Sequence, residues 1–180
     1  MMSFFKKIII YVVTISKLCY LFKVFFENYM YKITKGGNLL MNKIFVYGSL
    51  RQGMYNYDKY LKSENTFRCK AYIQGSLYTI KNELYPALLL EGHHMIVGEI
   101  HEVSHETMKT LDDMEGYILE NDDHNEYDKI VCDIYDENQQ IIDQLPTYVF
   151  NMRNPNNKER LGTFIDCLDY VEYMKKAETK

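Results

Sequence analysis

Residues 43–51 read Lys-Ile-Phe-Val-Tyr-Gly-Ser-Leu-Arg, an apolar run that ends in Gly48 and Ser49. Residues 43–46 have strand character, and polar sequence follows the serine. A strand end of this kind exposes backbone N–H groups that can surround an anionic group. An ordinary strand-to-loop turn has the same signature, so the stretch by itself leaves both interpretations open.

The pattern downstream of this strand predicts an α+β domain. Apolar and polar residues alternate over 67–80, around Gly75, which indicates a strand bent at a glycine or a hairpin. We predict strands at residues 43–46, 67–80, 85–90, 95–103, 127–135 and 144–150. We predict helices at residues 57–63, 105–113 and, from apolar residues at helical spacing, 161–171. The expected fold is a small mixed β-barrel of about six strands, or a curled sheet, with flanking helices.

Length and charge limit the classes of function. The chain has 180 residues, 47% of them hydrophobic, which suits a single globular domain with a sizeable core. Residues 41–180 hold 15 basic and 24 acidic side chains, a formal net charge of −9. A surface this acidic argues against nucleic-acid binding and does not disfavour a small zwitterionic substrate.

The first forty residues differ in character from the rest. In the segment 4–26, Lys6 and Lys7 precede an apolar run, as in a signal anchor, but further lysines interrupt the run and no small-residue cleavage site follows. Residues 35–41 read Lys-Gly-Gly-Asn-Leu-Leu-Met, which a translated ribosome-binding site upstream of a start codon would encode. We predict that Met41 is the true start, that residues 1–40 are an upstream extension, and that the domain spans residues 41–180. A weak signal anchor, which would tether the protein to a membrane, is the alternative.

Cysteine spacing argues against disulfides and zinc. The four cysteines are widely separated and form no Cys-x-x-Cys pair. Free, mostly buried thiols in a reducing cytoplasm are the expected state, so we predict a cytoplasmic protein. The positions are Cys19, Cys69, Cys132 and Cys167.

Neither a metal site nor a serine nucleophile finds support. His93 and His94 follow a Glu-Gly turn and His101 lies on the next strand, without a convincing further ligand. We expect these to be turn and surface histidines. Ser49 lacks the Gly-x-Ser-x-Gly surroundings of a hydrolase nucleophile.

Among the many acidic residues, Glu115 is the candidate for a catalytic carboxylate. It lies at the end of an apolar-periodic helix, between Met114 and Gly116, where its side chain can point into the interior. Because Asp112 and Asp113 precede it, a solvated helix end is the alternative interpretation.

Several short segments together are more specific than any one of them. In chain order they are Tyr47-Gly48-Ser49-Leu50-Arg51, Gly53 and Asn56, Gly75-x-Leu77-Tyr78, Tyr85-Pro86-Ala87, Val97-Gly98-Glu99-Ile100, Leu111-Asp112-x-x-Glu115-Gly116-Tyr117, Tyr127 and Tyr148. This ordered series resembles the γ-glutamylcyclotransferase-like family, which includes the AIG2-like proteins and the γ-glutamylamine cyclotransferases. The resemblance covers about residues 42–150.

The resemblance implies a cavity between the Tyr-Gly-Ser loop and the Leu-Asp-x-x-Glu-Gly segment. It implies Glu115 as the catalytic general base. The substrate-binding residues it implies are Tyr47, Gly48, Ser49 and Leu50, which would hold the α-carboxylate of a γ-glutamyl group, together with Tyr127 and Tyr148. One departure is Lys129, where the family often has an arginine; lysine keeps the charge but loses the guanidinium fork.

The implied reaction is intramolecular. The α-amine of a γ-glutamyl group attacks its own γ-amide carbonyl, which releases 5-oxoproline and a free amine without a cofactor or a metal. An ordinary Glu and an α-amine differ by roughly 3.5 pKa units, or about 5 kcal/mol, and burial of Glu115 would narrow that gap. The alternative is a non-catalytic barrel that binds a small ligand. The sequence carries no signal for the leaving amine or for the oligomeric state.

Overall fold

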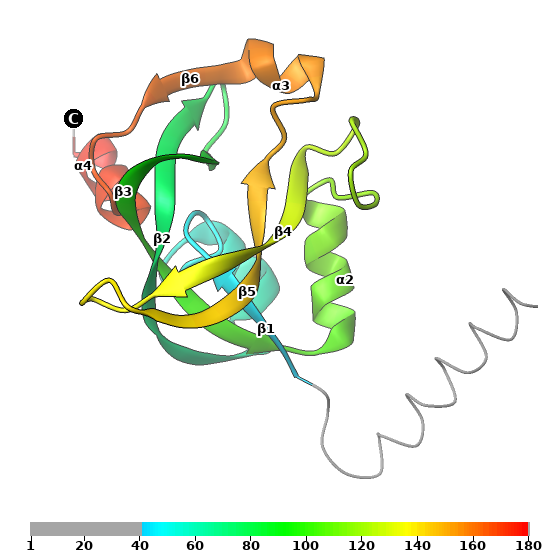
Figure 1. The fold of residues 1–180 in the computed structure, drawn as a ribbon, viewed down its shortest axis with the longest axis vertical. Helices are drawn as coiled ribbons and strands as arrows, with labels where there is room; N and C mark the ends of the chain where they lie inside the picture. The colour runs from blue at the N-terminus through cyan, green and yellow to red at the C-terminus, as the bar shows by residue number, and fades with distance from the viewer. Residues whose placement is uncertain (1–40, 180) are drawn as a thin grey trace, which may run out of the picture. The chain divides into compact units, whose positions relative to one another are not determined.

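The structure is a computed structural model that describes residues 41–179. The predictions about residues 1–40, whether an upstream extension or a signal anchor, lie outside these residues. The strands, in chain order, are β1 (Asn42–Val46), β2 (Asn65–Ile80), β3 (Pro86–Val103), β4 (Tyr127–Tyr135), β5 (Ile141–Phe150) and β6 (Leu161–Phe164) (Figure 1). The helices are the π-helix η1 (Tyr57–Leu61), α2 (His105–Met114), α3 (Pro155–Arg160) and α4 (Tyr170–Glu178).

The strands form one mixed sheet that curls back on itself. Its order is β3-β1-β5-β4-β2-β6, and β3 also pairs with β2. β1 runs antiparallel to β3 and parallel to β5. Between β4 and β2 the pairing consists of Tyr72 opposite Tyr135. The predicted α+β class with six strands and flanking helices is confirmed, and the thin β4–β2 junction makes it a strongly curled sheet more than a closed barrel.

β2 and β3 are longer than the sequence pattern indicates. β2 is a single strand with a register shift at Gly75, the first of the two predicted alternatives, and Pro86 is the first residue of β3. The two strands predicted at residues 85–90 and 95–103 are wrong as separate elements, because β3 continues through both. Gly92 has a φ of +100°, which lets residues 90–93 bulge out of the ladder without ending the strand.

The predicted helix at residues 161–171 is also wrong. Residues 161–164 form β6, which pairs with β2, and α4 begins only at Tyr170. A Cβ on Gly162 would lie 2.8 Å from the carbonyl oxygen of Thr79, so the glycine allows the two backbones to approach closely. Asp169 caps α4 by accepting from two of its first N–H groups.

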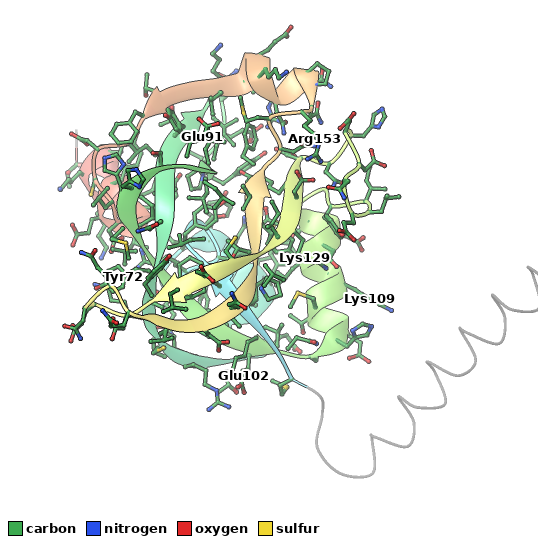
Figure 2. All side chains as sticks on the ribbon, in the orientation of Figure 1. Tyr72, Glu91, Glu102, Lys109, Lys129 and Arg153 are labelled. Carbon is green, nitrogen blue, oxygen red and sulfur yellow. The ribbon has the colours of Figure 1, made fainter. Side chains whose placement is uncertain are left out.

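β1 is buried on both faces, which places the following loop inside the fold. Phe45 belongs to one apolar cluster, and its neighbours Ile44 and Val46 belong to another. α4 residues pack on the first cluster, and α2 contributes Leu111 to the second. These two helices lie on opposite sides of the sheet in Figure 1, and side chains fill the space between the strands in Figure 2.

The structure describes three of the four cysteines. Cys69, Cys132 and Cys167 are free thiols, as predicted for these three. Across residues 41–179, the helices fall short of the length and hydropathy that a membrane span needs.

Candidate active site

A cavity of about 230 Å³ opens where β1 ends. Its wall is made of β1 and the loop after it, the start of β3, the end of α2, and β4 and β5. All seven residues predicted to form the site lie on this wall, so the structure brings them together. The lining consists of Phe45, Val46, Tyr47, Gly48, Ser49, Leu50, Tyr55, Asn56, Tyr85, Pro86, Met114, Glu115, Glu126, Tyr127 and Tyr148.

The loop after β1 is ordered by its own backbone. The carbonyl of Gly48 accepts from the N–H of Arg51 at 3.1 Å, and the carbonyl of Ser49 accepts from the N–H of Tyr57 at 3.1 Å. Within residues 41–179, the N–H groups of Gly48, Ser49 and Leu50 donate to no protein acceptor. Asn56 donates to the Ser49 hydroxyl at 2.9 Å. The loop therefore offers three backbone donors at the edge of the cavity, the arrangement that suits an anion.

Gly48 is required by close packing. A Cβ at this position would lie 2.8 Å from Cδ of Pro86, the residue that begins β3. The proline ring cannot swing aside, so only glycine lets the loop lie against the start of β3. The glycine at position 48 thus has a steric explanation.

A buried ionic network anchors the loop after β1 to β3 and to the start of α4. The Arg51 guanidinium contacts Glu99 of β3 at 3.3 Å and Asp169 at the start of α4 at 2.6 Å. Burial opposes the ionisation of Glu99, but hydrogen bonds from His101 and from the N–H of Gln52, with the charge of Arg51, outweigh it and hold its pKa below the ordinary value.

His101 belongs to this network, and its expected surface position is wrong. The side chain is fully buried, with Nε2 3.0 Å from Glu99 and Nδ1 2.6 Å from the side-chain oxygen of Asn65. The alternating pattern of β3 does not reveal this, because that strand is covered on both faces near residue 101.

Glu115 lies where α2 ends, opposite the loop. Its backbone N–H bonds to the carbonyl of Leu111, and Gly116 then leaves the helix with a φ of +61°. Burial, and secondarily the charge of Glu126, raise the pKa of Glu115 to about 8. Among the described residues, no hydrogen bond or ion pair engages its carboxyl group. The residue is half-buried and lies on the cavity wall.

The three tyrosines predicted to bind substrate form the wall through their rings. The Tyr47 hydroxyl donates to the carbonyl of Tyr148 at 2.8 Å, and the Tyr127 hydroxyl donates to the carbonyl of Pro86 at 2.9 Å. The Tyr148 hydroxyl donates to Asp112 at 2.7 Å. Each hydroxyl proton is therefore engaged by the protein, which fixes the rings in place.

Asp112 and Lys129 support the wall from behind. Lys129 Nζ lies 2.7 Å from both carboxylate oxygens of Asp112, and it stands over the ring of Tyr117 at 4.7 Å. In Figure 2 Lys129 extends from β4 beside α2. Neither Asp112 nor Lys129 lines the cavity. The lysine found in place of an arginine thus holds Asp112, which in turn orients Tyr148.

Some residues of the cavity wall were not predicted as site residues from the sequence. Tyr55 lies two residues before η1, and Glu126 closes a polar loop with no apolar periodicity. Tyr85 and Asn56 occur in the motif series, where their adjacency to Pro86 and to the Gly48–Arg51 loop is the available signal. No local pattern singles out Glu126 from the other acidic residues near it.

Comparisons with known proteins agree with this architecture. Residues 44–172 match the family model described as γ-glutamyl cyclotransferase, AIG2-like. The γ-L-glutamyl-butirosin B γ-glutamyl cyclotransferase of Niallia circulans is 40% identical over 115 residues, which is 64% of this chain and 70% of that protein.

Two solved structures have the same fold. An AIG2-like protein from Mus musculus aligns with a TM-score of 0.51 and 24% identity, covering 66% of this chain and 82% of that one. An uncharacterized protein from Pyrococcus horikoshii aligns with a TM-score of 0.53 and 21% identity, covering 77% and 97%. Since the family model spans most of the described residues, the chain belongs to the AIG2-like γ-glutamyl cyclotransferase family.

Proposed function

We propose that this protein is a γ-glutamyl cyclotransferase that converts a γ-glutamyl amide into 5-oxoproline and a free amine, with Glu115 as the general base. Family membership and the 40% identical cyclotransferase support the class of reaction. The observation that carries the residue assignment is one unpaired carboxyl group with a pKa of about 8, across a cavity from three unpaired backbone N–H groups.

In this proposal the loop holds the substrate's α-carboxylate. The N–H groups of Gly48, Ser49 and Leu50 are the donors, and the rings of Tyr47, Tyr127 and Tyr148 shape the surrounding wall. Such a clamp folds the γ-glutamyl group so that its amine approaches its own amide carbonyl. Amine and carbonyl belong to one molecule, so correct orientation supplies much of the rate acceleration.

Glu115 moves protons between the two nitrogen atoms. Its carboxylate takes a proton from the α-ammonium, and the free amine then forms a bond to the γ-carbonyl carbon. As the amide C–N bond breaks, the protonated Glu115 donates to the departing nitrogen. The two protons lost by the α-ammonium end on that nitrogen, so the amine leaves in its ammonium form and protons balance. A pKa of about 8 nearly matches that of an α-amine, roughly 8, which makes the first transfer almost isoenergetic.

This matching predicts the pH dependence of the reaction. kcat/KM should rise about tenfold per pH unit below pH 7, because Glu115 is increasingly ionised as its raised pKa is approached. It should reach a maximum near pH 8 and fall above. There the α-amine of the substrate, with a pKa of roughly 8, is already deprotonated, so Glu115 receives no proton to pass to the leaving nitrogen. Initial rates at low substrate from pH 5 to pH 10 measure the profile. An acidic limb centred below pH 6 would contradict the role of a perturbed Glu115.

The proposed reaction itself is tested by product release. Residues 41–180 and the full chain are incubated with γ-glutamyl amino acids and γ-glutamylamines, and 5-oxoproline is quantified. We expect 5-oxoproline and the amine in equal amounts from at least one substrate. Saturable substrate binding without product across the whole panel would instead support the ligand-binding alternative, with the cavity intact and no catalysis.

A further inference from the structure

Glu126 lies beside Glu115 on the cavity wall because backbone hydrogen bonds join residues 115–116 to residues 126–127. The N–H of Glu126 donates to the carbonyl of Gly116 at 3.1 Å, and the N–H of Tyr127 donates to the carbonyl of Glu115 at 3.2 Å. A Cβ on Gly116 would lie 3.1 Å from Cβ of Glu126. The glycine after the proposed base therefore makes room for a second carboxylate, which is close enough to contribute to the raised pKa of Glu115.

One oxygen of this carboxylate is held by the protein and the other is available. Oε1 of Glu126 accepts from the Tyr85 hydroxyl at 3.1 Å and contacts the Arg160 guanidinium at 3.0 Å. Over residues 41–179, Oε2 accepts no hydrogen bond from the protein. Since the residue lines the cavity, its second oxygen is free to accept from a ligand.

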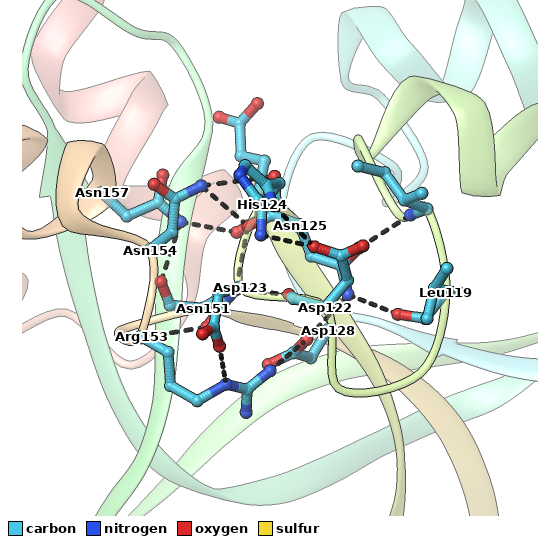
Figure 3. A network of polar contacts seen from close by, with 12 residues as sticks. Leu119, Asp122, Asp123, His124, Asn125, Asp128, Asn151, Arg153, Asn154 and Asn157 are labelled. Carbon is cyan, nitrogen blue, oxygen red and sulfur yellow. Dashed lines mark hydrogen bonds and ion pairs between the residues drawn. The ribbon is translucent and has the colours of Figure 1, made fainter.

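A cluster of four buried asparagines fixes the backbone of Glu126. The cluster is Asn125, Asn151, Asn154 and Asn157 (Figure 3). The side chain of Asn157 donates to the carbonyl of Glu126 at 2.8 Å, and the N–H of Asn151 donates to the same carbonyl at 3.1 Å. The other asparagines bond to carbonyls of residues 119–125. The loop before β4 is therefore pre-organised, so Glu126 keeps its position without a ligand.

The charges around the cavity favour a cation. In the described part of the chain, the lining holds two carboxyl groups, those of Glu115 and Glu126, and no lysine, arginine or histidine. Arg160, behind Glu126, is shared with Glu83 at 3.2 Å, so this cluster keeps one net negative charge. The formal net charge of −9 over residues 41–180 adds a long-range field of the same sign. A substrate whose leaving group carries a carboxylate would meet no compensating charge here.

We propose that Glu126 makes this site selective for γ-glutamyl substrates whose leaving amine carries a second positive charge, as a diamine does. The inference rests on the proposed cyclotransferase reaction and names its substrate class. The loop N–H groups take the α-carboxylate, Glu115 serves the α-amine, and Oε2 of Glu126 accepts from the distal ammonium group of the leaving amine. Such a charge-assisted hydrogen bond is stronger than a neutral one.

A matched pair of substrates tests this selectivity. γ-Glutamyl-1,4-diaminobutane and γ-glutamyl-n-pentylamine have the same length and differ by an ammonium group in place of a methyl group. We expect the wild-type protein to favour the diamine derivative by about tenfold or more in kcat/KM, and Glu126→Gln to reduce the ratio to within about twofold. Raising the salt concentration should not abolish the wild-type ratio, because the contact lies inside the cavity.

The control is Glu159→Gln, which removes one negative charge from the exposed face of α3. It should keep the wild-type ratio, and thermal unfolding of both variants checks that they fold. A ratio near one in the wild type, or an unchanged ratio in Glu126→Gln, would overturn the selectivity while 5-oxoproline release still supported the reaction. Absence of 5-oxoproline from every substrate would overturn the reaction, and this inference with it.

Discussion

Glu115→Gln is expected to lower kcat/KM by about 10²–10⁴-fold, the usual contribution of a general base. Glutamine keeps the shape of the side chain but cannot accept the proton of the α-ammonium. Because the proposed binding of the α-carboxylate depends on the loop and not on this residue, KM should change far less than kcat. 5-Oxoproline release at saturating substrate, compared with KM for the same substrate, separates the two effects.

The same variant should be more stable than the wild type, and increasingly so as pH rises. The folded-state pKa of Glu115 lies near 8, above the ordinary 4.5, so its ionisation costs the folded state free energy as pH rises from 4.5 to 8. Glutamine lacks this cost. The difference in Tm between variant and wild type should be small at pH 5 and reach several degrees at pH 8.

Asp113→Asn is the matched control for Glu115→Gln. Asp113 is exposed on the same helix end, and it loses a charge with the same isosteric change. Its activity should stay within about twofold of the wild type. Equal losses in both variants would show that charge at this helix end, and not proton transfer by Glu115, controls the rate.

Gly98→Ala is expected to cost about 3 kcal/mol or more of folding free energy, which corresponds to a fall in Tm of roughly 6–12 °C. A Cβ on Gly98 would lie 2.1 Å from the ring of Phe45 and 2.5 Å from the carbonyl oxygen of Val46. Phe45 has no exposed surface, and the carbonyl belongs to β1, so neither can move without displacing that strand. β1 leads directly into the loop that the proposed reaction depends on.

Gly53→Ala separates crowding from backbone conformation. Gly53 has a φ of +85° and open space where a Cβ would stand. Its substitution should cost only about 1–2 kcal/mol, the strain of a left-handed alanine. Thermal or urea unfolding of both variants gives the comparison. If Gly98→Ala were no more destabilising than Gly53→Ala, β1 and β3 would have to be less tightly packed than their register implies.

Elements whose signals are local were predictable from the sequence. β1 and the loop after it, α2 with its serine cap, and β4 each follow from periodicity and capping residues within a few positions. The loop that presents the backbone donors is likewise encoded by adjacent residues. The helix expected at residues 161–171 failed because apolar side chains at helical spacing were used by a sheet edge, with Gly162 against Thr79.

The candidate site divides in the same way. A strand that ends in Tyr47-Gly48-Ser49 and a helix that ends in Glu115-Gly116 are sequence signals, and they specify both halves of the cavity. Glu126, Arg160 and the asparagine cluster lie in polar segments without periodicity, so their roles exist only once the chain is folded. Backbone hydrogen bonds between residues 115–116 and 126–127 bring the two carboxyl groups together, and burial, with the charge of Glu126, raises the pKa of Glu115. The sequence alone therefore identifies the residues at the strand end and at the helix end. The electrostatic environment of the cavity depends on contacts between residues that are distant along the chain, so only the tertiary structure determines it.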